Sequence, residues 1–138
     1  MTAERGSFVS HVDAVVPMPV RRSEGWEQVD IRFLLPATLQ QDGARLALFR
    51  AVFPPGARHL AHTHPNAPEF VYVVTGEPML GDARGERKGG PGTVQFVPPG
   101  EVHWLWNTSD IAVEVVGGYL GVSSFEDAGY RPLGEPPA

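Results

Sequence analysis

Glycine and proline occur in this chain at short intervals, and their close spacing limits the possible folds more than any other feature. The 138 residues include 16 glycines and 14 prolines. Glycine tolerates the backbone angles of tight turns, whereas proline removes a backbone donor and ends helices. Few stretches are therefore long enough for a helix, and many short strands joined by turns are favoured. The sequence predicts an all-β sandwich or barrel.

The segments between these turns are rich in β-branched and aromatic residues, which favour strands. The expected strands cover residues 29–35, 45–54, 58–64, 69–75, 93–97, 102–106 and 111–120. We expect a turn over residues 39–43 and a polar, glycine-rich loop over residues 81–92. The length fits one domain that covers residues 1–138.

The two ends of the chain are less regular than its centre. Ser123 and Glu126 have the spacing of a capping box, which predicts a short C-terminal helical turn before Pro132. An N-terminal arm of about residues 1–25 is expected, either as an irregular edge strand or as a segment that lies on a partner subunit.

Charge and composition argue against several classes of protein. The formal net charge is −5, so the basic surface of a nucleic-acid-binding protein is not expected. The absence of cysteine excludes disulfides, thiolate metal ligands and a cysteine nucleophile. The N-terminal residues lack the apolar run of a signal peptide, and no stretch reaches the ~20 apolar residues of a membrane span. We therefore expect a cytoplasmic protein with no membrane partner.

Four side chains are candidate metal ligands. His62 and His64 are two residues apart, so in a strand both imidazoles point to the same face. Glu69 follows after a loop at the start of the next strand, where an antiparallel return brings its carboxylate beside the two rings. His103 begins a later strand, just after a Pro-Pro-Gly turn. A His-x-His pair also occurs without a metal, hydrogen-bonded or exposed to solvent. Three imidazoles and a carboxylate suit iron, manganese, zinc, nickel or copper.

The spacing of these residues resembles that of the cupin family. The pattern G-x5-H-x-H-x4-E-x6-G is matched by Gly56, His62, His64, Glu69 and Gly76. The pattern G-x5-P-x-G-x2-H-x3-N is matched by Gly92, Pro98, Gly100, His103 and Asn107. Together the two motifs span residues 56–107.

The resemblance implies a double-stranded β-helix, or jelly-roll barrel, and one divalent transition metal ion, with iron or zinc favoured. It assigns the four ligand roles to His62, His64, Glu69 and His103. The glycines and Pro98 of the motifs are expected to shape turns, and Asn107 is expected to be structural rather than a ligand.

Other residues are weaker candidates for the site. Arg58 shares strand parity with His62 and is a candidate for substrate binding, or else a rim residue that reaches solvent. Gln95 shares a face with Val97 and is expected to border the pocket, as a substrate-binding or a wall residue. His59, with the opposite parity, is expected outside.

Candidates for proton transfer are Glu101, two residues before His103, and Tyr72. The alternative for Glu101 is a surface turn. For Tyr72 and for Tyr119, which is also able to donate a phenolic proton, core packing is the alternative.

The cupin scaffold carries many activities, so several functions remain open. One hypothesis is a metal-dependent enzyme that acts on a small organic molecule. It is either a dioxygenase or a redox-neutral isomerase, cyclase or lyase of a carbonyl or enol substrate such as a polyketide. The alternatives are a metal-containing binding or sensor module and a purely structural barrel. We also expect a homodimer, with the N-terminal arm, Trp104, Trp106 and residues 111–120 as apolar surface.

Overall fold

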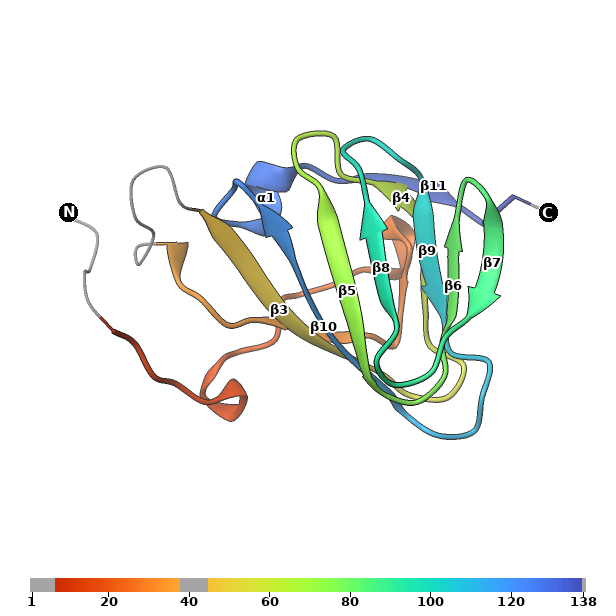
Figure 1. The fold of residues 1–138 in the computed structure, drawn as a ribbon, viewed down its shortest axis with the longest axis horizontal. Coiled ribbons are helices and arrows are strands. Elements are labelled where there is room, and N and C mark those ends of the chain that lie inside the picture. Colours follow the sequence, from red (N-terminus) through yellow and green to blue (C-terminus); the bar gives the residue numbers. More distant parts are fainter. Residues whose placement is uncertain (1–6, 38–44, 138) are drawn as a thin grey trace.

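Two antiparallel sheets pack face to face in the computed structural model, which describes residues 7–37 and 45–137 (Figure 1). The first sheet has the order β1 (Trp26–Glu27), β4 (Arg58–Thr63), β9 (His103–Trp106), β6 (Met79–Asp82) and β7 (Gly85–Lys88), and β11 (Arg131–Gly134) also pairs with β4. The second sheet has the order β2 (Asp30–Phe33), β3 (Leu46–Phe53), β10 (Val113–Leu120), β5 (Glu69–Thr75) and β8 (Val94–Val97). The chain passes repeatedly from one sheet to the other, which is the jelly-roll arrangement and confirms the predicted all-β barrel.

The barrel core comes from strands whose side chains alternate between the interior and the outer surface. In β3, Ala47, Phe49 and Ala51 are buried, while the residues between them are partly exposed. The same alternation in β10 buries Val113 and Val115. The strands expected from the sequence correspond to β2–β5 and β8–β10, and the turn expected over residues 39–43 lies outside the described residues. No helix in the described ranges is long and apolar enough to cross a membrane.

The polar loop expected over residues 81–92 is wrong for residues 81–88, because a hairpin of β6 and β7 is found there. All of β7 is exposed, and the hairpin contains no β-branched residue, so strand propensity gives no signal. The backbone N–H of Arg84 donates to the Asp82 side chain, and Gly85 takes a φ angle of +113° in this turn. Pairing of β6 with β9 holds the hairpin on the barrel.

The described part of the N-terminal arm is held to the barrel of its own chain at a few points, while Val9 and Val16 are exposed. The Met18 N–H donates to the Ile31 carbonyl, and the Arg32 guanidinium donates to the carbonyls of Val12 and Val15. Two 3-10 turns, η1 (Val12–Ala14) and η2 (Arg22–Glu24), interrupt this arm.

The C-terminal end contains the expected helical turn and one strand that the sequence did not predict. The helix α1 (Phe125–Ala128) begins one residue later than expected, since Ser124 rather than Ser123 accepts the capping hydrogen bond from Asp127 N–H. Strand β11 follows, with Pro132 in it. Proline is tolerated because β11 pairs with β4 at the edge of the sheet.

The glycines shared with the cupin motifs lie where the backbone requires them. Gly56, Gly76, Gly92 and Gly100 all have φ angles between +80° and +92°. At Gly76 space is also restricted, because an added Cβ would lie 2.7 Å from Val113 Cγ2 and 2.9 Å from the Ala112 carbonyl oxygen. These residues therefore shape turns, as the sequence predicts.

Asn107 closes the turn between β9 and β10 and is fully buried. Its amide donates to the Phe53 and Ile111 carbonyls, and its Oδ1 accepts hydrogen bonds from the N–H and the hydroxyl of Ser109. The side chain thus satisfies groups from β3 and from the loop between β9 and β10. This arrangement confirms the structural role predicted for Asn107.

Replacing Asn107 by alanine is expected to lower the free energy of unfolding by about 3 kcal/mol, because several buried polar groups lose their partner at once. Denaturant unfolding followed by circular dichroism measures this loss. The neighbouring Thr108 is exposed, so Thr108→Ala is the matched control and should change stability by less than about 0.5 kcal/mol. Equal stability of the two variants would contradict the structural role of Asn107.

Candidate metal centre

Four buried side chains from three strands and one loop meet inside the barrel. They are His62 at the end of β4, His64 just after it, Glu69 at the start of β5 and His103 at the start of β9, and they are between 2% and 5% exposed. One ligand atom from each residue lies within 4.8 Å of the others. The structure thus brings together the four candidate ligands that the sequence singled out.

A β-bulge in β4 sets the direction of the side chains of His59 and His62. Against β9, Arg58 pairs with Trp106 and His59 with Leu105, but the next pair is His62 with His103. One extra residue of β4 therefore lies between the paired positions, so the side-chain alternation changes phase there. As a result His59 and His62 both point inward although they are three residues apart.

The three histidines are oriented by backbone carbonyls. The Nδ1 atoms of His62, His64 and His103 lie 2.6, 2.8 and 3.1 Å from the carbonyl oxygens of Leu60, Gly129 and Glu101, respectively. A carbonyl only accepts hydrogen bonds, so each Nδ1 carries a proton and a neutral ring has its lone pair on Nε2, whereas His103 Nε2 donates to the Glu69 carboxylate. This tautomer is the one that leaves Nε2 free to bind a metal ion.

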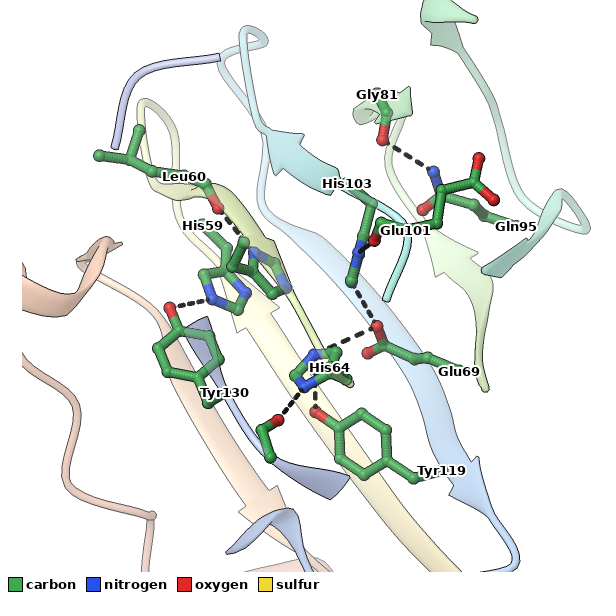
Figure 2. Close-up of polar contacts among 12 residues, drawn as sticks. His59, Leu60, His64, Glu69, Gly81, Gln95, Glu101, His103, Tyr119 and Tyr130 are labelled. Atoms are coloured by element: carbon green, nitrogen blue, oxygen red, sulfur yellow. Dashed lines mark hydrogen bonds and ion pairs between the residues drawn. The ribbon is translucent and has the colours of Figure 1, made fainter. Parts of the chain in front are cut away.

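The spacing of the remaining atoms fits a single cation. Glu69 Oε1 lies 2.6 Å from His103 Nε2 and 3.5 Å from His64 Nε2 (Figure 2). Metal–ligand distances of about 2.0–2.2 Å place ligand atoms about 3.0–4.2 Å apart around one ion. A small rearrangement of these side chains is therefore sufficient. Nitrogen and carboxylate ligands without thiolate suit a divalent transition metal.

The electrostatic environment differs among the three rings. Burial lowers the pKa of His62 far below its usual value, and the neighbouring histidines lower it further. Burial also lowers the pKa of His64, although the Glu69 carboxylate acts in the opposite direction. At His103 burial again lowers the pKa, but the Glu69 carboxylate outweighs it and the net shift is upward. His62 and His64 are therefore neutral near pH 7, as metal ligands must be.

His59 lies inside the barrel, so the prediction that it points outward is wrong. The bulge described above is the reason. Its ring stacks between Trp26, at a centroid distance of 3.5 Å, and His62, at 3.6 Å. Tyr130 donates its hydroxyl proton to the Glu24 carbonyl, so His59 Nε2 donates to the Tyr130 oxygen at 2.9 Å. With Nε2 occupied, His59 supports the ring of His62 and does not join the ligand set.

Tyr119, rather than Tyr72, is the tyrosine at the centre. Tyr119 on β10 pairs with Glu69 on β5, is 1% exposed, and places its hydroxyl 3.5 Å from His64 Nε2. Burial raises its pKa well above the usual value, and the Glu69 carboxylate adds to this effect. Tyr72 lies on the outer face of β5 and is 46% exposed, because its parity is opposite to that of Glu69. The structure does not bring Tyr72 to the ligands.

Arg58 also lies away from the ligands, because it precedes the bulge. Its guanidinium binds Glu27, with Nε 2.8 Å from Oε1, and Glu135, with both terminal nitrogens at 3.0 Å. It also lies over the Trp106 ring, 5.4 Å from the centroid. Arg58 thus ties β4 to β1 and to the C-terminal segment.

Gln95 does border the site. It faces inward from β8 beside Val71, is 8% exposed, and donates its amide N–H to the Gly81 carbonyl on β6 at 3.0 Å. Glu101 contributes its backbone carbonyl to His103, while its carboxylate lines an outer groove rather than the ligand cluster. The catalytic role suggested for Glu101 therefore remains a prediction.

Trp104 points away from the ligands, as expected from its alternation with His103. Its side chain is nevertheless buried and not available to a partner subunit. The residue is 3% exposed and its Nε1–H donates to Glu86 on β7 at 2.9 Å. Its ring covers Gly81 on β6, where a Cβ atom would lie only 1.9 Å from the indole. The neighbouring hairpin therefore covers Trp104 within the same chain.

An internal cavity adjoins the candidate ligands. Its lining includes His62, Glu69 and His103 together with apolar side chains and Gln95. Its volume is about 30 Å³, and a water molecule needs at least about 10–15 Å³ measured in this way. The space beside the ligands therefore has room for no more than a few atoms of a ligand.

Comparisons with known proteins agree with this geometry. The family model described as "Cupin domain" matches residues 49–118, which is just over half of the chain. These residues contain both sequence motifs and all four candidate ligands. No match was found among the curated proteins.

Similar solved structures carry several different activities. A predicted oxalate decarboxylase from Thermotoga maritima is 24% identical with a TM-score of 0.72, covering 82% of this chain and 98% of its own. The polyketide cyclase RemF from Streptomyces resistomycificus is 19% identical with a TM-score of 0.70, covering 89% and 91%. A sugar phosphate isomerase of the cupin superfamily from Silicibacter pomeroyi is 24% identical with a TM-score of 0.65, covering 79% and 73%. At these identities the likeness shows the fold alone.

Proposed function

This chain belongs to the cupin family, and from that premise we propose that it is a metal-dependent enzyme that acts on a small organic molecule. One divalent ion is held by His62, His64, Glu69 and His103. The observation that carries this proposal is the orientation of the ligand set. Three Nδ1 atoms are fixed on backbone carbonyls, so three Nε2 atoms and one carboxylate converge in a buried space.

The energetic cost of this cluster supports a metal rather than a purely structural barrel. A buried carboxylate beside three imidazoles is costly to desolvate unless an opposite charge compensates it. A divalent transition metal, when bound, supplies a Lewis acid for a carbonyl, enol or carboxylate oxygen, and iron in addition supplies a redox centre.

The residues of the chain then have separate tasks. The three histidines and Glu69 hold the ion, and the Tyr119 hydroxyl is placed to hydrogen-bond beside His64. Apolar residues such as Phe49 and Val115 line the cavity and keep bulk water out. Because the cavity volume is about 30 Å³, only the reactive group of a substrate fits beside the ligands. A large substrate such as a polyketide would leave most of its volume outside.

Turnover assays with defined metals test this function. The protein is loaded with iron(II), manganese(II) or zinc(II) and incubated with oxalate, a sugar phosphate, a catechol and an aromatic polyketide. Product should form only in metal-loaded protein. Turnover with zinc, or without oxygen, would identify redox-neutral chemistry, whereas turnover only with iron and with oxygen consumption would identify a dioxygenase. Tight binding without product under every condition would contradict the enzyme and favour a binding module.

The homodimer and the cytoplasmic location expected from the sequence remain predictions. Trp104 and most of β10 do not offer the expected apolar surface, because both are covered within the chain. The expected apolar exposure is found at Trp106, Ile111, Leu120, Val9 and Val16. Further exposed apolar side chains lie on the neighbouring strands β5 and β8, namely Tyr72, Val74, Val94 and Phe96.

A further inference from the structure

We propose that a small anionic substrate reaches the metal centre through a groove between the β6–β7 hairpin and β8, and that the Gln95 side chain forms the inner wall of this entrance. This inference rests on the proposed metal-dependent function and adds to it a substrate charge and a route. We call this feature the β7–β8 groove. Its lining consists of Leu80, Asp82, Arg84, Arg87, Lys88, Gly89, Thr93, Val94, Gln95, Phe96, Pro98 and Glu101.

The groove lies where the two sheets end beside each other. β7 is the last strand of one sheet and β8 the last strand of the other. The volume of the groove is about 580 Å³, which is within the usual range of about 300–1,000 Å³ for small-molecule sites. The groove therefore has room for the body of a substrate that the small inner cavity cannot hold.

Cations outnumber carboxylates in the lining. Arg84, Arg87 and Lys88 face two acidic residues, Asp82 and Glu101. Arg87 forms an ion pair with Asp82. In the described part of the chain no ion pair involves the side chain of Arg84 or Lys88, so both charges are available to a ligand. In a protein with a net charge of −5, this local excess of positive charge favours a small anion such as a carboxylate.

Gln95 connects the groove to the metal centre. The residue lines the groove and also the inner cavity that contains His62, Glu69 and His103. Figure 2 shows its amide directed at the Gly81 carbonyl, a contact of 3.0 Å that joins β8 to β6 across the end of the two sheets. A single hydrogen bond of this kind contributes only about 1 kcal/mol. Breaking this hydrogen bond, and so opening the wall between the groove and the inner cavity, therefore costs little free energy.

The binding of oxalate to cobalt-loaded protein tests this route without measuring turnover. Cobalt(II) replaces the native ion, and stopped-flow absorption follows the change in its visible spectrum when oxalate binds. Imidazole serves as a neutral ligand of the same ion. Arg21 is exposed and lies outside the groove, so Arg21→Glu is the control with the same change in net charge as Arg84→Glu.

At low ionic strength, Arg84→Glu and Lys88→Glu are each expected to slow oxalate association by about fivefold or more, with imidazole association unchanged. The difference should disappear in high salt, because salt screens exposed charges. Gln95→Ala should speed the association of both ligands by about threefold or more, since it removes the bond that closes the wall. Arg21→Glu should leave both rates as in the unmodified protein.

Three results would overturn the proposal. If cobalt binds but the rates for Arg84→Glu, Lys88→Glu and Gln95→Ala equal that of the unmodified protein, the route is wrong and the proposed function stands. If cobalt binds but oxalate does not change its spectrum, the anionic substrate is wrong and the proposed function again stands. If no cobalt binds, the proposed function and this inference both fail.

Discussion

Replacing His62 or His103 by alanine is expected to reduce the bound metal of the purified protein to below about a tenth of the unmodified level, with an affinity loss of about a hundredfold or more. Each substitution removes one of four converging ligand atoms, and His103→Ala also removes a hydrogen-bond partner of the Glu69 carboxylate. The metal content by mass spectrometry and the affinity by competition with a chelator measure this effect. Circular dichroism should show that both variants retain the barrel.

Two other histidines provide matched controls for these variants. His59 is also buried and stacks on His62, yet its Nε2 is bound to Tyr130. His11 is exposed on the N-terminal arm. His59→Phe and His11→Ala should therefore keep stoichiometric metal. Full metal occupancy in His62→Ala and His103→Ala would show that the ion is held elsewhere.

Gly81→Ala is expected to lower the free energy of unfolding by about 3 kcal/mol, which corresponds to a melting temperature lower by about 10 °C. An added Cβ would lie 1.9–2.4 Å from three atoms of the Trp104 indole. The ring cannot move away freely, because Gly81 and Trp104 are paired across β6 and β9 and the indole N–H is bound to Glu86. Thermal and denaturant unfolding of the variant measure the loss.

A double-mutant cycle assigns this loss to the ring. Trp104→Ala alone should cost about 3–5 kcal/mol, because it removes a large buried side chain. Adding Gly81→Ala to Trp104→Ala should then cost less than about 1 kcal/mol, since the clash is gone. If the two losses simply add, the close packing of the indole on Gly81 is not the cause.

The ligand set and its motifs were predictable because they depend on short spacings. His62 and His64 keep their relation within a few residues, and turn glycines such as Gly76 need a positive φ angle that other residues rarely adopt. These requirements are local, so they are visible in the sequence. The all-β class was predictable from the closely spaced glycines and prolines and from the β-branched residues between them.

The errors arise where one strand depends on another. The bulge in β4 is defined by its register against β9, and it reverses the expected orientations of Arg58 and His59. The β6–β7 hairpin has little strand propensity of its own and depends on pairing with β9. Tyr119 approaches His64 only because β10 pairs with β5. Tertiary pairing of this kind leaves no signal in a single sequence.

The central claim is that His62, His64, Glu69 and His103 surround one transition metal ion. X-ray absorption spectroscopy of protein purified without added metal tests it most directly, together with a count of metal per chain. We expect one ion per chain, with three imidazole nitrogens and carboxylate oxygen at about 2.0–2.2 Å. No metal above background, or an ion whose spectrum lacks three imidazole ligands, would contradict the account.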